Sequence, residues 1–387
     1  MKMKIRTVWL LVGLVTALFV LGACGADDEG SGVAVLGSDA TGEERLQALI
    51  DGAREEGELN VYVISALGQE GAAAIASAFN EQFGLDIDFK ADTDESEALS
   101  QALIEVELGS EATHDIMWQS GYEDAVELIA VNGVACIDEW ESILQAMSPK
   151  AYAARDQISY LDIEGCGFKW GDWIRVMIYN TELISADELP KTHADVGNAE
   201  YAGEYTVTPF NSHIRMLILK YEPEEVINIA RAWGAGGGDY LFTGAAIPRL
   251  SVGEYKFHTG AGAQKEALFA EGSPLAVAFF EDVTQFIDVY YTPRANAKNP
   301  NAAALFALWA TTPEANVVWE KFGTATNLSL GTGPLSQKYS KQIQDAGIEL
   351  VSWFGTAEFA ALKDWSDNTD EGKAFKEALD NAYRGRE

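Results

Sequence analysis

The 387-residue sequence is poor in the residue patterns that usually carry out catalysis. It holds only four histidines, and none of them lies in an HExxH motif. A GxSxG motif and a Walker A loop are also missing. These absences exclude a zinc protease of the HExxH type, a serine hydrolase with a nucleophile elbow and a P-loop nucleotidase. We therefore expect a protein that is not an enzyme and that needs no cofactor.

Basic residues are scarce as well. The sequence has 27 Lys and Arg against 60 Asp and Glu, which gives a formal net charge of −33. Such a balance argues against nucleic acid as a partner, because phosphate-binding surfaces are basic. Two interpretations of the charge stay open: a solvated acidic surface that keeps the protein soluble, or a field that steers a cationic solute.

Cysteine is rare too, with three in the whole chain. Cys136 and Cys166 are the two that lie beyond the N-terminal region, and neither stands in a CxxC motif or at a Cys/His spacing typical of metal sites. In an oxidising compartment outside the cytoplasm the two can form a disulfide. Two separate buried thiols are the alternative.

The N-terminus has the pattern of an export signal. Three basic residues among the first six precede an apolar run at 8–20, which ends in the tetrapeptide Leu-Gly-Ala-Cys at Cys24. The run is shorter than the ~20 residues that a membrane-spanning helix needs. The tetrapeptide resembles the lipobox of bacterial lipoproteins, which implies a signal peptide at 1–23 and lipid attachment, including palmitate, at Cys24. We expect an exported protein that faces the periplasm or the cell exterior and is anchored by lipid alone; an ordinary signal with a chance cysteine is the alternative.

The rest of the chain predicts a tether followed by a large α/β region. Residues 24–45 are rich in Gly, Ala and acidic side chains, which is typical of a flexible tether. The remainder exceeds the ~250–300 residues at which one hydrophobic core stops growing, so we expect two lobes. Within it, the β-branched run at 59–65, a helix pattern up to Gly84 and the alternating segment at 85–92 predict a strand–helix–strand unit with a parallel sheet.

Longer stretches resemble one known family. The segments at 56–92, 114–138, 173–184, 189–213 and 296–324 are similar, in this order, to bacterial extracellular solute-binding proteins of ABC importers, of the iron(III), thiamine and polyamine type. The third begins WIRVMIYNT and the last reads NAKNPNAAALFALWATTPEANVVWEKFGT, with Asn299 where the family often has His. The resemblance covers most of the chain and does not identify a ligand.

The resemblance implies a two-lobed α/β fold of the type II periplasmic binding proteins, with the ligand in the cleft between the lobes. It implies a small-molecule solute and ABC permease subunits as partners, and a monomer. The first lobe would comprise residues 46–170 and about 292–345, and the second about 171–291 with the C-terminal helices at 346–387. The segments around Trp173 and Tyr290 would cross between the lobes.

The pocket is expected where strand ends face the cleft. The candidate ligand-binding residues supply hydroxyl, amide or ring contacts, and they are Ser65, Trp118, Ser120, Trp173, Phe210, Asn211, Ser212 and His258. A core position is the alternative for each tryptophan. Arg175 or Arg215 can hold an anionic group through its planar fork, or each can pair with one of the many carboxylates of the chain.

Ferric iron is the alternative to an organic solute. Ferric-binding members of the resembled family carry adjacent tyrosines after a Gly-Glu segment, whereas the corresponding stretch here has Tyr255 and His258 without such a pair. Tyr290 and Tyr291 are adjacent, but they lie on the expected return crossover. The remaining candidates are neutral groups and rings, which favours a small organic solute over a metal ion.

Overall fold

The structure is a computed structural model that describes residues 37–93, 97–120, 122–159, 163–237, 239–352 and 357–386; for 122–123 and 357–360 it describes the backbone alone. The predicted signal peptide and Cys24 lie outside these residues, as does most of the predicted tether. Within the described ranges, no helix is long and apolar enough to cross a membrane.

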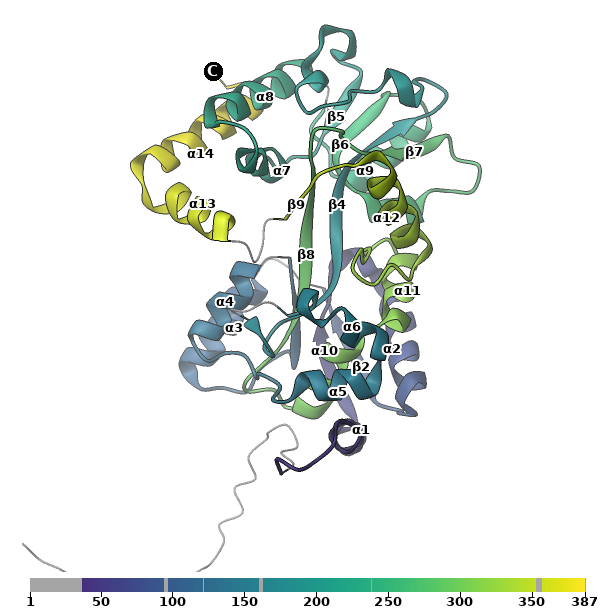
Figure 1. Ribbon diagram of the computed structural model, residues 1–387, viewed down its shortest axis with the longest axis vertical. Coiled ribbons are helices and arrows are strands. Elements are labelled where there is room, and N and C mark those ends of the chain that lie inside the picture. Colours follow the sequence, from purple (N-terminus) through teal and green to yellow (C-terminus); the bar gives the residue numbers. More distant parts are fainter. Residues whose placement is uncertain are drawn as a thin grey trace, which may run out of the picture. The chain divides into compact units, whose positions relative to one another are not determined.

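Helices and strands alternate in the first part of the described chain (Figure 1). They are α1 (Gly42–Glu56), β1 (Glu58–Tyr62), α2 (Gly68–Phe83), β2 (Asp88–Asp92), α3 (Ala98–Leu108), β3 (Ile116–Gln119), α4 (Tyr122–Ala130), α5 (Trp140–Met147) and α6 (Pro149–Ala153). β1 pairs in parallel with both β2 and β3, which confirms the parallel sheet expected here. The expected end of α2 is also confirmed, because Gly84 adopts the left-handed conformation (φ 61°) that terminates the helix.

Helix α1 begins inside the segment that was expected to be a tether. Thr41 and Glu44 form a capping box, in which the Thr41 hydroxyl accepts from the Glu44 N–H and the Glu44 carboxylate accepts from the Thr41 N–H. Leu49 and Ala53 then pack the helix against the core. The expected end of the tether at residue 45 is therefore too late, because α1 already begins at Gly42. The acidic residues Glu43 and Glu44 lie in its first turn, where the helix dipole favours negative charge.

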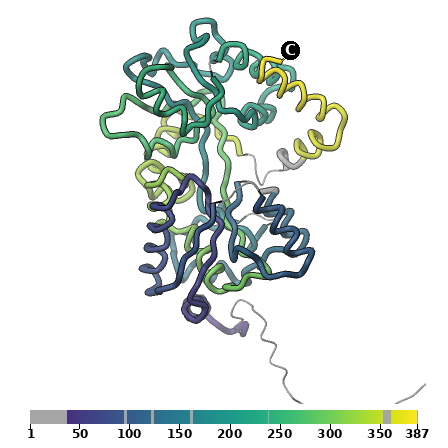
Figure 2. Tube along the Cα trace, turned by 180° about the vertical axis from the view of Figure 1, so that it is seen from behind, coloured from purple at the N-terminus to yellow at the C-terminus, as the bar shows by residue number. Residues whose placement is uncertain are grey.

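The remaining elements complete one mixed sheet and its covering helices. They are β4 (Phe168–Asn180), β5 (Tyr205–Val207), α7 (Ser212–Arg215), α8 (Pro223–Gly236), α9 (Thr243–Ser251), β6 (Phe257–Gly262), β7 (Leu275–Ala278), β8 (Thr284–Pro293), α10 (Pro300–Ala310), α11 (Pro313–Lys321), α12 (Pro334–Ala346), β9 (Leu350–Ser352), α13 (Ala357–Asn368) and α14 (Asp370–Tyr383). The strand order is β2-β1-β3-β8-β4-β6-β5, with β7 beside β4 and β9 beside β8. The last helix, α14, packs on α8 (Figure 2).

Two long strands, β4 and β8, connect the two parts of this sheet. β8 pairs antiparallel with β3 and with the first half of β4, from Phe168 to Ile174. The second half of β4, from Arg175 to Asn180, pairs instead with β6 and β7. The segments around Trp173 and Tyr290, which were expected to cross between lobes, therefore lie on the strands that the two parts of the sheet share.

Separate clusters of buried side chains flank these strands. One packs α2, α10 and α11 around β1 and β3, with Phe79 against Phe306 and Trp309. Another joins β5 and α8 to α14, and a third covers the opposite face of β4 with α9 and α12. Tyr339 and Ile343 of α12 belong to this third cluster, whereas the expected lobe boundaries had placed residues up to 345 with the first lobe.

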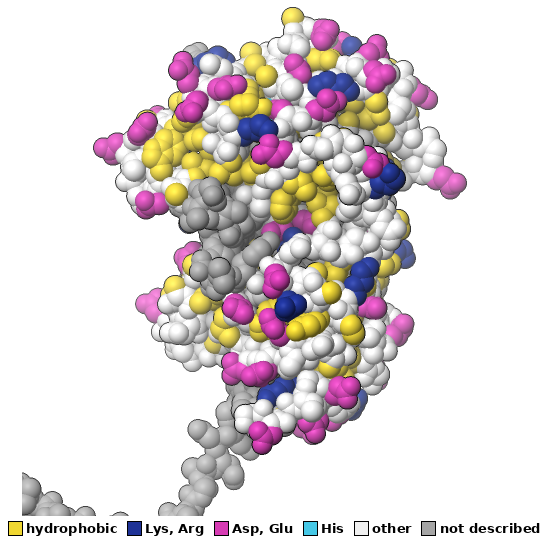
Figure 3. All heavy atoms as spheres, in the orientation of Figure 1, with side chains coloured by type: hydrophobic (Ala, Val, Ile, Leu, Met, Phe, Trp, Pro, Cys, Tyr) yellow, Lys and Arg dark blue, Asp and Glu magenta, His cyan; other side chains and the backbone are white. Residues whose placement is uncertain are grey.

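Acidic side chains are dispersed over the face of the molecule shown in Figure 3, with few Lys and Arg among them. Many of the described ion pairs are exposed, such as Lys341 with Asp345 and Arg54 with Asp51. Exposed pairs of this kind contribute only about 0–1 kcal/mol each. Such pairs therefore add little to the stability of the fold.

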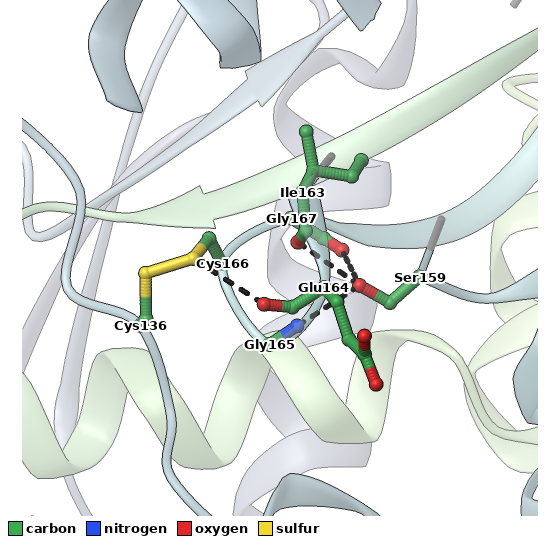
Figure 4. The surroundings of a disulfide bond; sticks show 7 residues. All are labelled: Cys136, Ser159, Ile163, Glu164, Gly165, Cys166 and Gly167. Atoms are coloured by element: carbon green, nitrogen blue, oxygen red, sulfur yellow. Dashed lines mark hydrogen bonds between the residues drawn. A yellow bond between two sulfur atoms is a disulfide. The ribbon is translucent and has the colours of Figure 1, made fainter. Parts of the chain in front are cut away.

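Cys136 and Cys166 are joined by a disulfide (Figure 4). The turn that carries Cys166 is held by Ser159, whose hydroxyl lies 2.8 Å from the Gly167 carbonyl oxygen and accepts from the Gly165 N–H. The bond links the segment after α4 to the start of β4, 30 residues further on. It therefore fixes the approach to one of the two long strands.

Candidate functional site

A pocket of about 180 Å³ lies at the carboxyl ends of β1 and β3. It is lined by Tyr62, Ala98, Leu99, Met117, Trp118, Gln119, Ser120 and Asp124. These residues meet because β1 and β3 run in parallel, so that their carboxyl ends reach the same edge of the sheet as the first turns of α3 and α4. This edge is where open α/β sheets bind ligands. Two of the expected site residues, Trp118 and Ser120, are thus brought together.

The pocket wall contains buried polar atoms that have no partner. The Nε1 atom of Trp118 and both amide atoms of Gln119 make no hydrogen bond in the described structure, although Gln119 is only 3% exposed. A buried polar group without a partner costs about 1–3 kcal/mol, so these groups are suited to bind a solute that supplies the missing partners. Sequence reasoning missed Gln119, although it stands between Trp118 and Ser120 at the end of the same strand.

Aromatic rings extend from the pocket to β4. The rings of Tyr62 and Trp118 stack with centroids 6.4 Å apart, and Trp118 meets Trp173 at 5.9 Å. Trp173 is fixed by a hydrogen bond of 2.7 Å from its Nε1 to the carbonyl oxygen of Thr324. The structure therefore brings the expected residue Trp173 into contact with the pocket wall, and both tryptophans keep some exposure.

Asp124 is the one carboxylate among the described residues that line the pocket. Burial raises its pKa, and the negative charge of Glu127 raises it further, whereas the positive charge of Lys363 lowers it. Lys363 belongs to α13, so this helix reaches the neighbourhood of α4. A carboxyl group in this setting can accept a hydrogen bond or pair with a cationic group of a solute.

Three other expected residues lie on the turn between β5 and α7. Phe210 is 57% exposed and packs edge-on against Phe242, with centroids 5.4 Å apart. Asn211 donates from Nδ2 to Asp380 of α14 over 3.4 Å, and Ser212 is the first residue of α7. None of the three lines the 180 Å³ pocket.

The remaining two expected residues also lie outside the pocket lining. Ser65 is exposed at the start of the short turn before α2. His258 is fully buried, with its ring nitrogens 2.9 Å from the Thr206 hydroxyl and 3.3 Å from the Thr243 hydroxyl. Burial lowers the pKa of His258 to about 4, so the ring is neutral at physiological pH. The structure thus places His258 in the core with both nitrogens paired.

A larger groove of about 470 Å³ runs along α3 and is lined in part by exposed Ile104 and Leu108. Its buried acid, Glu105, is already bonded to Thr113 and Arg294. The groove holds no buried unpaired polar group among its lining residues. The smaller pocket is therefore the better candidate for solute binding.

No protein-family model and no curated protein match the sequence. Solved structures do match the fold. The substrate-binding protein of an ABC transporter from Agrobacterium tumefaciens superposes with a TM-score of 0.62 at 16% identity, over 85% of this chain and 97% of that one. The fold is that of the two-lobed periplasmic binding proteins. The expected fold class is confirmed.

Two further matches have different cargoes in their names. The apo ferric ion-binding protein A of Pasteurella haemolytica matches with a TM-score of 0.59 at 14% identity, over 84% of this chain and 96% of that one. The spermidine/putrescine ABC transporter substrate-binding protein PotD of Streptococcus pneumoniae matches with a TM-score of 0.59 at 14% identity, over 83% of this chain and 99% of that one. At such identities the likeness establishes the fold alone.

Proposed function

We propose that this protein captures a small organic solute outside the cytoplasm and delivers it to the permease of an ABC importer. The observation that carries the proposal is the pocket at the ends of β1 and β3, whose wall holds the unpaired buried atoms of Trp118 and Gln119. The fold supports it, because two of the structures named above are substrate-binding proteins of ABC transporters. The permease would be the partner, and the protein would act as a monomer.

Solute capture would proceed by closure of two lobes that hinge on β4 and β8. These strands are shared by the two parts of the sheet, and separate hydrophobic clusters lie on either side of them. A change of backbone angles in a few residues of such strands can move one packed body relative to another without breaking either core. The division into lobes follows the boundaries given above, with α12 assigned to the second lobe.

Export and lipid attachment at Cys24 are part of the same proposal. The basic residues, the apolar run and the tetrapeptide ending in Cys24 support them. The Cys136–Cys166 disulfide supports an oxidising compartment, since such bonds are rare in the cytoplasm. A lipid-anchored binding protein would remain close to its permease.

Ferric iron is the second candidate cargo, favoured by the names of several similar structures. Side chains of adjacent strand residues point to opposite faces of the sheet. Tyr290 packs with Ala125 and Ile163, whereas Tyr291 packs with Trp170 and Phe306. Burial also raises the pKa of Tyr291, which opposes the phenolate form that a ferric ion needs. The tyrosine pair is therefore unsuited to hold one metal ion, and the organic solute is preferred.

A thermal-shift screen of the purified mature protein tests the function. Polyamines, thiamine, sugars, amino acids, phosphonates and ferric citrate would each be added in excess, and a bound solute should raise the melting temperature. Trp118→Ala should remove the shift, whereas the exposed Gln157→Ala should keep it. A protein that binds no solute of any class but turns one over would contradict the proposal, and a shift with ferric iron alone would favour the second candidate.

A further inference from the structure

Arg175 on β4 is a half-buried arginine without an acidic partner among the described residues, in a chain with 60 acidic residues. Its Nη1 atom donates to the Gly260 carbonyl oxygen over 3.2 Å. Its Nε atom is shut off from solvent and has no hydrogen-bond partner. Burial lowers the pKa of Arg175 to about 10, and no carboxylate offsets this effect, although the group stays charged at physiological pH.

Arg294 is a buried arginine of the same protein whose charge is paired, and it serves as a comparison for Arg175. It is 2% exposed, and its Nη2 atom lies 3.3 Å from the Glu105 carboxylate and 3.1 Å from the Ala102 carbonyl oxygen. Its Nε atom donates to the Gly133 carbonyl oxygen. A buried charge is costly unless it is paired and hydrogen-bonded, and Arg294 meets both conditions. Arg175 does not, so its charge is available to a partner that the chain itself does not supply.

The free part of Arg175 is the edge that recognises oxyanions. Because Nη1 is used by Gly260, the unpaired Nε and the adjoining Nη2 remain as two parallel donors. This planar fork matches a carboxylate or a phosphonate with two hydrogen bonds. Arg175 keeps partial exposure while its Nε is shut off from solvent, so a solute that uses the whole edge has to displace the groups that cover Nε.

Among the described residues, the surroundings of Arg175 add no negative charge and are closely packed. Gly260 has a φ of +81°, and a Cβ there would lie 2.6 Å from the Thr208 methyl group and 3.0 Å from Nε2 of His213. His213 is 2% exposed, and its Nε2 has no hydrogen-bond partner. Burial, and then the charge of Arg175, hold the pKa of His213 well below its ordinary value, so the ring is neutral. The net charge of this group of residues is therefore positive.

Arg175 is continuous with the pocket wall. It stands two residues after Trp173 on β4, so both side chains point to the same face, with Cα atoms about 6.6–6.8 Å apart. Trp173 in turn contacts Trp118 of the pocket. A solute held by the rings and by Gln119 can therefore place one end near Arg175.

We propose that the solute carries an anionic oxygen group, a carboxylate or a phosphonate, that binds the Nε–Nη2 edge of Arg175. This inference rests on the proposed function and makes it more specific, since the sequence alone favoured a solute held by neutral groups. The net charge of −33 does not oppose it strongly, because exposed charges are largely screened beyond ~8 Å at physiological ionic strength.

Calorimetric titration of the mature protein with matched solutes tests the chemistry. Amino acids and dicarboxylates of two to six carbons would each be compared with their primary amides, and phosphonates of equal length would separate the two anion classes. We expect an acid or a phosphonate to bind and its neutral amide to bind at least tenfold more weakly. Arg175→Gln should weaken binding of the acid tenfold or more and leave binding of the amide unchanged. Arg175→Lys should restore part of the affinity for the acid. Arg249, which is half-buried like Arg175 but paired with Asp239 and Glu254, gives the matched control: Arg249→Gln should change the affinity for neither the acid nor the amide.

A stability measurement keeps the inference testable even when the panel contains no ligand. Without its solute, an unpaired arginine destabilises the fold, so Arg175→Met should keep or raise the melting temperature, whereas Arg294→Met should lower it by several degrees. If Arg175→Met lowered the melting temperature as much as Arg294→Met, the inference would be overturned, because Arg175 would then have a structural role. Tight binding of a neutral or purely cationic solute, unaffected by Arg175→Gln, would overturn it as well while leaving the proposed function intact. If no solute class bound the parent protein and Arg175→Met raised the melting temperature, the result would instead count against the proposed function.

Discussion

At the scale of single residues, the informative side chains are those whose polar atoms lack partners. Most buried polar groups of this protein are bonded, as His258 is to Thr206 and Thr243. Gln119 and Arg175 depart from that pattern, and both lie at or beside the pocket wall. Unpaired buried groups reduce stability, and a ligand that completes their hydrogen bonds is one reason to find such a group beside a pocket.

Gln119 provides the first prediction. Gln119→Met removes an unsatisfied amide and keeps the volume, so the melting temperature should stay the same or rise. Solute affinity should fall at least tenfold, equivalent to ~1.4 kcal/mol, because the amide no longer bonds the solute. Thermal unfolding and calorimetric titration measure the two effects. Gln157→Met, on an exposed turn, is the control, and a large loss of stability at Gln119→Met would mean that the amide is structural.

Lys169 provides the second prediction. It is almost fully buried between Asp288, at 2.5 Å, and Asp172, at 3.8 Å. Lys169→Met would leave these carboxylates without their cation, so the free energy of unfolding should fall by about 3–5 kcal/mol. Urea unfolding measures it. The same change at exposed Lys341 should cost no more than about 1 kcal/mol.

The stability that Lys169→Met loses should depend on pH in a defined direction. Burial raises the pKa of Asp172 in the folded protein, in spite of the opposing effect of Lys169. The folded state then holds this proton more tightly than the unfolded state, so stability from this group is lost as the pH rises through the folded pKa. The difference in unfolding free energy between the parent protein and Lys169→Met should therefore shrink as the pH falls. A difference that grows towards acidic pH would contradict the role given to Lys169 and Asp172.

At the scale of elements, the disulfide and the long strands decide how the two parts of the sheet are connected. The disulfide closes a loop of 30 residues that ends beside the start of β4. A cross-link over such a loop stabilises a protein by about 2–4 kcal/mol, chiefly by restricting the unfolded chain. We expect the double variant Cys136→Ala with Cys166→Ala to lose stability in this range and to keep solute affinity, since neither residue lines the pocket. Urea unfolding of the variant and of the oxidised parent protein tests this, and an unchanged midpoint would argue against the bond.

At the scale of the whole molecule, closure on β4 and β8 predicts a change of dimensions. Small-angle scattering should show a smaller radius of gyration when a saturating solute is present. Gln119→Met, which should bind poorly, serves as the control and should keep the larger radius at the same solute concentration. An unchanged radius in a parent protein that binds its solute tightly would exclude closure as the mode of capture.

The anchor gives the last prediction. Cys24→Ser should release the protein from the membrane fraction or leave the precursor uncleaved, because the thioether to lipid can no longer form. Mass spectrometry of the N-terminus of the parent protein should find a lipid-modified Cys24. An unmodified chain that begins at another residue would refute the anchor.

The sequence by itself determined the class of fold and the first strand–helix–strand unit of the sheet. Local patterns were enough for this, since the run at 59–65 and the alternation along 85–92 predict strands, and Gly84 ends the helix between them. Strand ends can also be recognised along the chain, and two residues predicted there, Trp118 and Ser120, line the candidate pocket. The local pattern did not reveal where α12 packs.

Only the tertiary structure decided which polar groups have partners. His258 and Arg175 were both plausible ligand contacts in the sequence, but the fold pairs His258 with two hydroxyls and gives Arg175 a single carbonyl. Tyr290 and Tyr291 are adjacent in the chain, and the pleat of β8 sends them into different clusters. Hydrogen-bond satisfaction depends on contacts between residues far apart in the sequence, as between Arg175 and Gly260, and no local pattern records such contacts.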